Sequence, residues 1–334
     1  MALLIEQVVD AAGVEQWHDV EEQSVPVDQV GLLADPLEEA MSLFSNQART
    51  ERHVMFIARD GDDVVGNAMV SFPLLDNTDN AMVHLTVVPE RRRQGFGRAL
   101  VTHLFDVART EGRSRGMGFV ASPMDADGPG LEFATNLGAT RANENHRREL
   151  DLRRIDDGQL DDLARDRVGQ RASGYHVVTW VDRAPDELVE GAARLMARMS
   201  TDAPQGDSAW EPEAWDADRY RDTEAQSASA RRQRFVAGAV DAVTQELVAY
   251  TDIGVSTIRR TIAYQWDTVV APEHRGHRLG LVIKIENVRQ LRRASAASER
   301  LETWNAASNT FMVSVNDALG FRPVERTTHL QLDL

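Results

Sequence analysis

Hydrophobic residues along the first half of the chain follow two kinds of pattern, which take turns along the sequence. Short runs of alternating or continuous apolar residues are typical of strands, whereas apolar residues spaced by four are typical of helices. The helical pattern is clearest from Phe96 through Leu100 and Leu104 to Ala108, and Gly112 ends it. These patterns predict strands over residues 3–9, 53–59, 64–72, 81–88, 117–121 and 140–152, and helices over 95–111, 132–137 and much of the acidic segment up to about residue 50.

The second half of the chain repeats this order of elements. Pro185 opens the first helix, at a position that proline favours. The patterns predict strands over 174–181, 235–240, 247–255, 262–271, 301–304 and 322–332, and helices over 185–199, 281–291 and 307–319. Because strands and helices alternate, each half is expected to be an α/β structure with helices layered on a mixed (α+β) sheet.

Two stretches of the chain resemble each other, one from Val87 to Gly97 and one from Val270 to Gly280. Their prolines, Pro89 and Pro272, are 183 positions apart, and a downstream Leu-Gly pair at 137–138 and 319–320 keeps an offset of 182. Two anchors that hold nearly one offset indicate a duplication. We therefore predict an N-terminal domain over 1–152 and a C-terminal domain of the same fold over 174–334. A charge-dense linker over 153–173, with one short helical segment, would join them.

The composition excludes several classes of function. Acidic residues outnumber basic ones, and the net charge of the 334-residue chain is −16. A nucleic-acid-binding protein needs a basic surface, so this balance argues against one and permits a cationic partner such as an amine. The absence of cysteine excludes disulfides, thiolate catalysis and cysteine-ligated metals. The N-terminus is unlike a signal peptide, and no run reaches about 18 apolar residues, so we expect a cytoplasmic protein without a membrane partner.

Each repeated stretch joins a strand, a proline, an arginine-rich loop and a glycine-containing helix start. Glycine lets the backbone approach a ligand, and the first helical turn offers unpaired N–H groups and the positive end of the helix dipole. This combination suits a pyrophosphate group. A Walker A loop is excluded because no Gly-Lys-Ser/Thr follows, and a Rossmann fingerprint because Leu100 occupies the third glycine position. The surrounding basic residues are Arg91, Arg92, Arg93 and Arg98 in the first copy, and Arg275, His277 and Arg278 in the second.

The segment from Val88 through Arg92 to Gly97 resembles the acetyl-CoA-binding signature Arg/Gln-x-x-Gly-x-Gly/Ala of the GNAT N-acetyltransferase superfamily. The segment from Thr303 to Phe321, with Asn305, Asn309 and Leu319-Gly320, is similar to that family's C-terminal Asn…Leu-Gly-Phe region. With one copy in each half, the chain resembles tandem GNAT proteins of the mycothiol-synthase type. The resemblance implies mixed sheets in which two parallel strands splay apart to admit the pantetheine arm. It also implies direct acyl transfer from the thioester to an amine, without a covalent enzyme intermediate.

The resemblance gives a set of candidate site residues. The CoA-binding candidates are Val87, Val88, Arg92, Arg93, Gln94, Gly95, Phe96, Gly97 and Arg98 in the first copy, and Val269, Val270, Arg275, Gly276, His277, Arg278, Leu279, Gly280, Asn305 and Asn309 in the second. A base that accepts the amine proton is expected on the strand before the turn, where His84 aligns with Asp267. The substrate-binding candidates are Asp202, Asp207, Gln265 and Trp304.

The sequence departs from the family pattern at three positions. Arg278 replaces the first glycine of the second signature. The family often has a tyrosine, acting as general acid to the leaving thiolate, where this chain has Ala134 and Asn316. Asn316 is the third catalytic candidate by position, but since its amide does not titrate, the proton would come from water or from another residue.

Structural roles are the alternatives for most candidates. His84 and Asp267 can be hydrogen-bonded core residues, Asn305 and Asn309 can be helix caps, and Asp202 and Asp207 can be solvated. Three further observations concern basic residues. Lys284, the only lysine, is expected to extend to the surface, with a CoA phosphate contact as the alternative. The run Arg231, Arg232 and Arg234 is interpreted as a solvated helix end, and His274 with His277 lacks a third metal ligand, so no metal is expected.

The sequence therefore predicts an acetyl-CoA-dependent N-acetyltransferase that acylates the primary amine of a small molecule, as a monomer or homodimer. Catalysis is assigned to the second copy, and the first copy would bind CoA or serve structurally. The alternative is a non-catalytic acyl-CoA sensor or assembly protein with degenerate domains.

Overall fold

The computed structural model of the chain describes residues 3–46, 48–202 and 204–334. The chain forms two compact units. Unit 1 comprises Met1–Glu144, Gly206–Glu211 and Glu325–Leu334, and unit 2 comprises Asn145–Gln205 and Pro212–Val324. No helix among the described residues is both long and apolar enough to cross a membrane.

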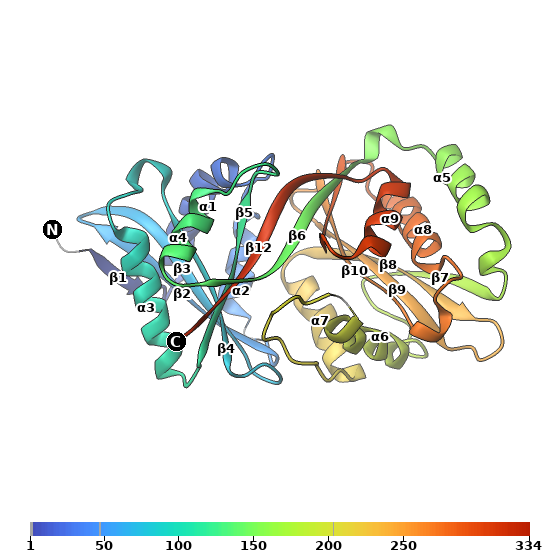
Figure 1. Cartoon of the computed structure of the whole chain (residues 1–334), viewed down its shortest axis with the longest axis horizontal. Helices are drawn as coiled ribbons and strands as arrows, with labels where there is room; N and C mark the ends of the chain where they lie inside the picture. The colour runs from blue at the N-terminus through green and yellow to red at the C-terminus, as the bar shows by residue number, and fades with distance from the viewer. Residues whose placement is uncertain (1–2, 47, 203) are drawn as a thin grey trace. The chain divides into compact units, whose positions relative to one another are not determined.

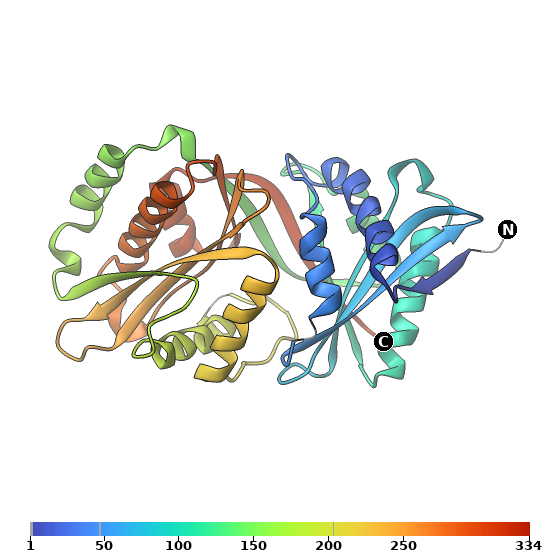
Figure 2. The ribbon, with the colours of Figure 1, turned by 180° about the vertical axis from the view of Figure 1, so that it is seen from behind.

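Unit 1 is a mixed sheet with helices on both faces (Figures 1 and 2). The strands lie in the order β1-β2-β3-β4-β5-β12, and only β4 and β5 are parallel neighbours. Helices α1 and α2 pack on one face, and α3 and α4 on the other. The elements are β1 (Leu4–Gln7), α1 (Ala11–Asp28), α2 (Leu37–Ser45), β2 (Glu51–Asp60), β3 (Asp63–Pro73), β4 (Asn80–Val87), α3 (Phe96–Thr110), β5 (Arg115–Ser122), α4 (Pro129–Asn136) and β12 (Arg322–Asp333).

Unit 2 repeats this layout. Its strands lie in the order β6-β11-β10-β9-β8-β7, and only β10 and β11 are parallel neighbours. Helices α6 and α7 cover one face, and α8 and α9 the other (Figures 1 and 2). The elements are β6 (Thr140–Asp151), α5 (Asp157–Leu163), β7 (Tyr175–Val181), α6 (Val189–Asp202), α7 (Ala217–Ser229), β8 (Arg232–Asp241), β9 (Leu247–Ser256), β10 (Ile262–Val270), α8 (Leu279–Ala294), β11 (Arg300–Ala306) and α9 (Thr310–Leu319).

The last strand of each repeat belongs largely to the unit formed by the other repeat. Residues 326–333 of β12 pair with β5, and residues 145–151 of β6 pair with β11. The units therefore differ from the contiguous domains expected at 1–152 and 174–334. The alternating pattern of a strand sets which face its side chains occupy, but not the sheet in which it pairs. The segment expected to be a linker, 153–173, is also part of unit 2, because Leu160 and Val168 are buried in that unit's core.

The core of each unit fixes the helix that follows its parallel strand. Leu100 and Leu104 of α3 are fully buried against Phe56 and Phe72. The corresponding stripe of α8, which includes Leu281, Ile285, Val288 and Leu291, is buried in the core of unit 2. Full burial of such a side chain contributes about 1.5–3 kcal/mol. The first turns of α3 and α8 are thereby held at the ends of β4 and β10.

The largest departure from the predicted elements lies before β8. Helix α7 was not predicted, because its polar sequence carries little helical periodicity. Arg234 was expected at a solvated helix end but is a buried residue of β8, where its guanidinium bonds Asp252 Oδ2 at 2.9 Å and the Tyr250 hydroxyl at 2.7 Å. The buried acid that offsets its charge is 18 positions away, beyond the reach of local sequence patterns.

Candidate functional site

Two parallel strands in each unit pair only over their first residues. In unit 1 the pairing of β4 with β5 ends at Met82 with Met117. In unit 2 the pairing of β10 with β11 ends at Gln265 with Thr303. Met82 and Gln265 are 183 positions apart, the offset of the repeat, so each unit opens its sheet at the same place. The predicted splay is present in both units.

The turn before α3 leaves a row of backbone donors open. Arg93 and Gly95 have positive φ values of 62° and 90°, and no side chain caps the helix start. The backbone N–H groups of residues 93–98 have no acceptor among the described residues. Gln94, Phe96 and Gly97 lie within this row. The turn is therefore an anion-binding geometry at a helix N-terminus.

The turn before α8 keeps the same backbone conformation, but glycine and arginine have exchanged positions. Gly276 has φ 88° where unit 1 has Arg93, and Arg278 has φ 60° where unit 1 has Gly95. The left-handed conformation is retained at Arg278 at a cost of about 1 kcal/mol for a residue with a Cβ. The N–H groups of residues 276–280, including His277, Leu279 and Gly280, are open in the described structure. Arg278 thus leaves the shape of the turn intact.

The arginines of the turns divide into paired and unpaired ones. Arg92 donates to Asp28 at 2.8 Å and to the Val87 carbonyl at 2.9 Å. Arg275 repeats this with Asp202 at 2.8 Å and the Val270 carbonyl at 3.2 Å. Asp202, expected to contact substrate, instead neutralises an arginine of the turn. The two arginines hold the loops in shape rather than presenting free charge.

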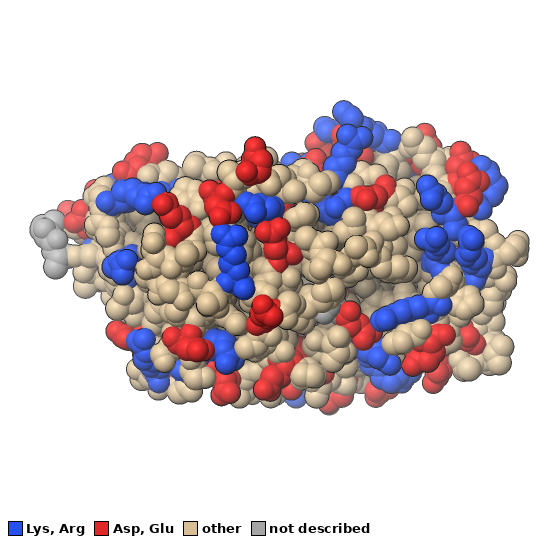
Figure 3. Space-filling model, in the orientation of Figure 1, with Lys and Arg blue, Asp and Glu red and all other residues tan. Residues whose placement is uncertain are grey.

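Free positive charge lies beside these loops. Arg98 and Arg278 are exposed, and their guanidinium groups have no hydrogen-bond or ion-pair partner among the described residues. Arg278 lines a cavity of about 310 Å³ with Arg167, Leu281 and four residues of α9, Ser314, Val315, Asp317 and Ala318. On the face shown in Figure 3, basic side chains gather over the part of unit 2 that carries α5 and α8. The cavity and its two guanidinium groups fit the phosphates of a nucleotide-like donor.

His84 projects from the splayed part of β4 and contacts a carboxylate. Its Nε2 lies 3.1 Å from Glu21 Oε1 of α1, and Asn67 donates to the same oxygen at 2.7 Å. Burial opposes the charged imidazolium, but the Glu21 carboxylate and its hydrogen bond outweigh that effect and raise the pKa of His84. Since 39% of the His84 side chain is exposed, this is a surface-accessible imidazole–carboxylate pair rather than a core histidine.

Replacing Glu21 with glutamine is expected to lower the pKa of His84, because the amide removes the charge that stabilises the imidazolium. A histidine NMR titration of both proteins measures the change. His53, whose pKa burial lowers to about 4, is the internal control and should titrate unchanged. An unaltered His84 titration would show that Glu21 does not govern it.

Asp267 projects from the equivalent position of β10, within the register shift between Gln265 and Thr268. Burial raises the pKa of its carboxyl to about 7, the charge of Asp252 and that of Glu213 add to this, and Arg234 opposes it. Its backbone is fixed, because its N–H donates to Asp252 Oδ1 at 3.1 Å and its carbonyl accepts from the Thr251 hydroxyl at 3.0 Å. Its carboxylate oxygens accept no hydrogen bond from the described residues and are available to a proton.

The other substrate candidates have different surroundings. Gln265 is buried, and its amide donates to the Thr251 hydroxyl at 2.9 Å and to the Asp252 carbonyl at 2.6 Å, so it holds the bulge of β10. The ring of Trp304 stacks on Tyr264, with centroids 6.1 Å apart. Asp207 lies in unit 1, where its N–H donates to the Ala142 carbonyl at 2.8 Å. The acidic pair expected from Asp202 and Asp207 is thus divided between the two units.

Two of the candidate asparagines in the second copy, Asn305 and Asn316, are hydrogen-bonded to each other, and the third, Asn309, is a helix cap. Asn316 of α9 donates to Asn305 Oδ1 of β11 at 3.0 Å, and Asn305 is not a helix cap. Asn309 does cap α9, since its Oδ1 accepts from the Met312 N–H at 3.1 Å. Lys284 Nζ donates to Asn316 Oδ1 at 2.8 Å. Lys284 was expected at the surface or on a CoA phosphate, but it is buried.

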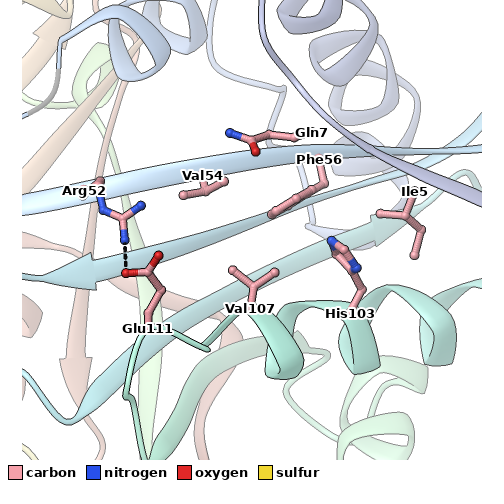
Figure 4. Close-up of a pocket in the computed structure, with 8 residues that line it drawn as sticks. All are labelled: Ile5, Gln7, Arg52, Val54, Phe56, His103, Val107 and Glu111. Atoms are coloured by element: carbon pink, nitrogen blue, oxygen red, sulfur yellow. Dashed lines mark ion pairs between the residues drawn. The ribbon is translucent and has the colours of Figure 1, made fainter. Parts of the chain in front are cut away.

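Unit 1 has a cavity that is separate from the open turn before α3 (Figure 4). It has a volume of about 390 Å³ and lies between β1, β2 and the later turns of α3. His103 packs edge-to-face on Phe56, and Arg52 forms an ion pair with Glu111 at 2.6 Å. None of the candidate site residues lines it.

Known proteins share this arrangement. The acetyltransferase (GNAT) family model matches residues 15–127, a segment that contains β4 and the turn before α3. A tandem GNAT protein from the clavulanic acid biosynthesis pathway, solved without AcCoA, is 28% identical. The match covers 99% of this chain and 98% of that one, with a TM-score of 0.82. The chain carries a GNAT acetyltransferase domain and has the fold of two tandem GNAT domains. The predicted resemblance to GNAT proteins and the predicted duplicated fold are confirmed at this level.

More distant structural similarity shows the fold alone. A GCN5-related N-acetyltransferase from Sphaerobacter thermophilus is 14% identical, with 99% of this chain and 95% of that one covered and a TM-score of 0.66. No curated protein sequence matches the chain at a significant level.

Proposed function

We propose that this GNAT protein transfers an acetyl group from acetyl-CoA to the primary amine of a small molecule, and that unit 2 carries the reaction. The observation that carries the proposal is Asp267, a carboxylate with a pKa of about 7 in the splayed part of β10. It lies on the strand that leads into the open turn of α8. A donor site and a base are thus built on one strand.

The residues of unit 2 fit acetyl-CoA as the acyl-donor substrate. The open N–H groups of residues 276–280 and the free guanidinium of Arg278 suit its phosphates, with Arg167 beside them. The opening between β10 and β11 after Gln265 suits the pantetheine arm. Acetyl-CoA supplies an activated thioester carbonyl, which needs only a neutral amine as nucleophile. Asp267 in its ionised form would accept the proton that the amine loses.

Unit 1 is assigned to donor binding or to structure. It has an open turn and free Arg98, and His84 stands where unit 2 has Asp267. The imidazole of His84 is held by the Glu21 carboxylate, whereas no described residue hydrogen-bonds to the Asp267 carboxylate. His84 is therefore less suited to accepting an amine proton than Asp267.

A non-catalytic acyl-CoA sensor is the competing function. It is favoured by the absence of a tyrosine hydroxyl at Ala134 and Asn316. Incubation of the protein with acetyl-CoA and a panel of amines separates the two functions. The panel would contain an alkylamine, a diamine, an amino acid amide and an aminosugar. Acetylated amine together with free CoA supports the enzyme, and binding of acetyl-CoA without either product supports the sensor.

Blocking one turn at a time should identify the catalytic unit. Gly97 and Gly280 have no positive φ, and an added Cβ would make only ordinary contacts, with Phe133 at 3.6 Å and Val270 at 3.7 Å. Tryptophan at either position should therefore fill the ligand path without straining the backbone. We expect Gly280→Trp to lose at least about 100-fold in kcat/KM, the scale of a lost positioning interaction. Gly97→Trp should keep most of it. Loss in Gly97→Trp alone would reverse the assignment of the units.

The proposal extends to the charge of the acceptor, the location of the protein and its oligomeric state. An acidic chain with a net charge of −16 attracts cationic acceptors and repels nucleic acid. A cytoplasmic location and a monomeric or homodimeric state are expected. Size-exclusion chromatography with light scattering tests the oligomeric state.

A further inference from the structure

Lys284 is a cation in an unusual position. It is the only lysine of the chain and is 1% exposed. Its ammonium has one hydrogen-bond acceptor among the described residues, Asn316 Oδ1 at 2.8 Å, and lies 5.3 Å from the centre of the Phe321 ring. No carboxylate within the described structure pairs with it. Burial of a charge without a partner is costly, so such residues usually serve a function.

The surroundings of Lys284 connect it to the opening in the sheet. It lies on α8, about 7–8 Å along the helix from Leu279 at 1.5 Å per residue. Asn316 links it to Asn305 of β11, two residues beyond the last residue paired with β10. Leu281, one turn before Lys284, and Val315, next to Asn316, line the cavity that contains Arg278. Lys284 therefore stands between the open turn and the splayed strands.

The same position in unit 1 shows that the fold does not need this lysine. The repeat offsets place Val101, a buried residue of α3, at the position of Lys284 and Ala134 at that of Asn316. A valine and an alanine complete the same layer of unit 1. A buried lysine–asparagine pair is thus a property of unit 2, the unit that carries Asp267.

The proton state of Lys284 suits exchange near neutral pH. Burial, together with the charge of Arg148, lowers the pKa of its ammonium to about 7. Arg148, from β6, is itself ion-paired with Asp317 of α9. Asp267 lies on the other face of the sheet, beside Asp252 and Arg234. Helix α7 covers this face, and the ring of its Tyr220 packs against Arg234. A base and an acid therefore approach the opening from opposite faces.

We infer that the Lys284 ammonium is the proton donor to the CoA thiolate, in place of the tyrosine that this chain lacks. The inference rests on the proposed function. The amine nitrogen forms a bond to the carbonyl carbon and gives its proton to the Asp267 carboxylate. The carbon–sulfur bond then breaks, and the thiolate sulfur takes a proton from Lys284 Nζ. This leaves CoA thiol, the acetylated amine, neutral Lys284 and protonated Asp267. Exchange of one proton with water restores both residues.

The single lysine allows a direct test on the intact protein. Lysine labelled with ¹³C at Cε and ¹⁵N at Nζ gives one side-chain signal, which can be titrated with pH in the free protein and with CoA added. A midpoint near 7 and a shift of the signal on CoA binding are expected. A midpoint near the 10.5 of an ordinary lysine, or a signal unaffected by CoA, would overturn the inference.

Two variants separate proton donation from hydrogen bonding. Lys284→Met removes both, whereas Lys284→Gln keeps an N–H donor for Asn316. We expect both to lower kcat by about 100-fold, the lower range for a general acid, with the KM for acetyl-CoA changed less than about threefold. The fall of kcat above about pH 7 in the wild type should vanish in both.

Three outcomes would contradict the inference. Full turnover in Lys284→Gln would show that the hydrogen bond suffices. Full turnover in Lys284→Met would show that the lysine is not used, while the proposed function would stand. No acetylated amine from the wild type would overturn the proposed function and this inference together.

Discussion

Exchanging Asp267 for asparagine is expected to lower kcat for acetyl transfer by about 100- to 10,000-fold, the usual contribution of a positioned general base. The amide keeps the shape of the carboxylate but cannot accept a proton. The substitution should leave the fold intact, because no described residue donates a hydrogen bond to the Asp267 carboxylate. The KM for acetyl-CoA should therefore stay within about threefold of the wild type, since CoA contacts are untouched.

The pH dependence of this variant carries additional information. The ionised Asp267 carboxylate is the base and the protonated Lys284 ammonium is the acid, and both have a pKa of about 7. The kcat/KM of the wild type should therefore peak near pH 7, with a rise on the acidic side that follows the ionisation of Asp267. Asp252 and Glu213 raise the pKa of Asp267 and Arg234 lowers it. The rise should be absent in Asp267→Asn. His84→Gln, at the equivalent position of unit 1, is the matched comparison, and a larger loss there than in Asp267→Asn would contradict the assignment of the base.

Replacing Lys284 with methionine is expected to stabilise the protein while it slows the reaction. The pKa of Lys284 is about 7 in the native state, compared with 10.5 for an ordinary lysine. At low pH the buried ammonium therefore lowers the free energy of unfolding by about 4–5 kcal/mol. Methionine removes that penalty, and loss of the bond to Asn316 costs about 1–3 kcal/mol. The net gain in the free energy of unfolding should be about 2 kcal/mol at pH 6.5.

The sign of the pH effect follows from proton binding. Between about pH 7 and 10.5 the unfolded chain holds a proton on Lys284 that the native state lacks, so wild-type stability from this group rises with pH. The advantage of the methionine variant should therefore shrink from pH 6.5 to 9.5. Urea unfolding of both proteins at the two pH values measures it. A variant less stable than the wild type at pH 6.5 would show that the fold compensates the buried charge. A stabilising substitution that removes activity is the pattern expected of a functional residue.

The open turns and the order of elements could be predicted because they depend on local sequence. Gly95 and Gly276 mark left-handed backbone, and the apolar stripes of α3 and α8 identify the helices behind them. Because the offset of the repeat is nearly constant, each feature found in one unit could be located in the other. It also placed Asp267 opposite His84, both on splayed strands.

The partners of the charged residues could not be predicted, because they come from distant segments. Glu21 is 63 positions from His84, and Asn316 is 32 from Lys284. Arg234 and Lys284 were assigned to the surface on residue type alone, yet both are buried. The exchange of β6 and β12 escaped prediction for a related reason, since the alternation of a strand sets the faces of its side chains and not the neighbour with which it pairs. The sequence does hold one signal for the buried cation, because Lys284 is the single lysine among 37 lysine and arginine residues.

The central claim, acetyl transfer from acetyl-CoA to an amine, can be tested by measuring thiol release. The chain contains no cysteine, so a thiol reagent detects only free CoA. The protein is incubated with acetyl-CoA and each amine of the panel, and thiol and acetylated amine are measured in the same sample. We predict that both products rise one-for-one with at least one amine. Acetyl-CoA that binds but yields neither free thiol nor acetylated amine with any member of the panel would contradict the account.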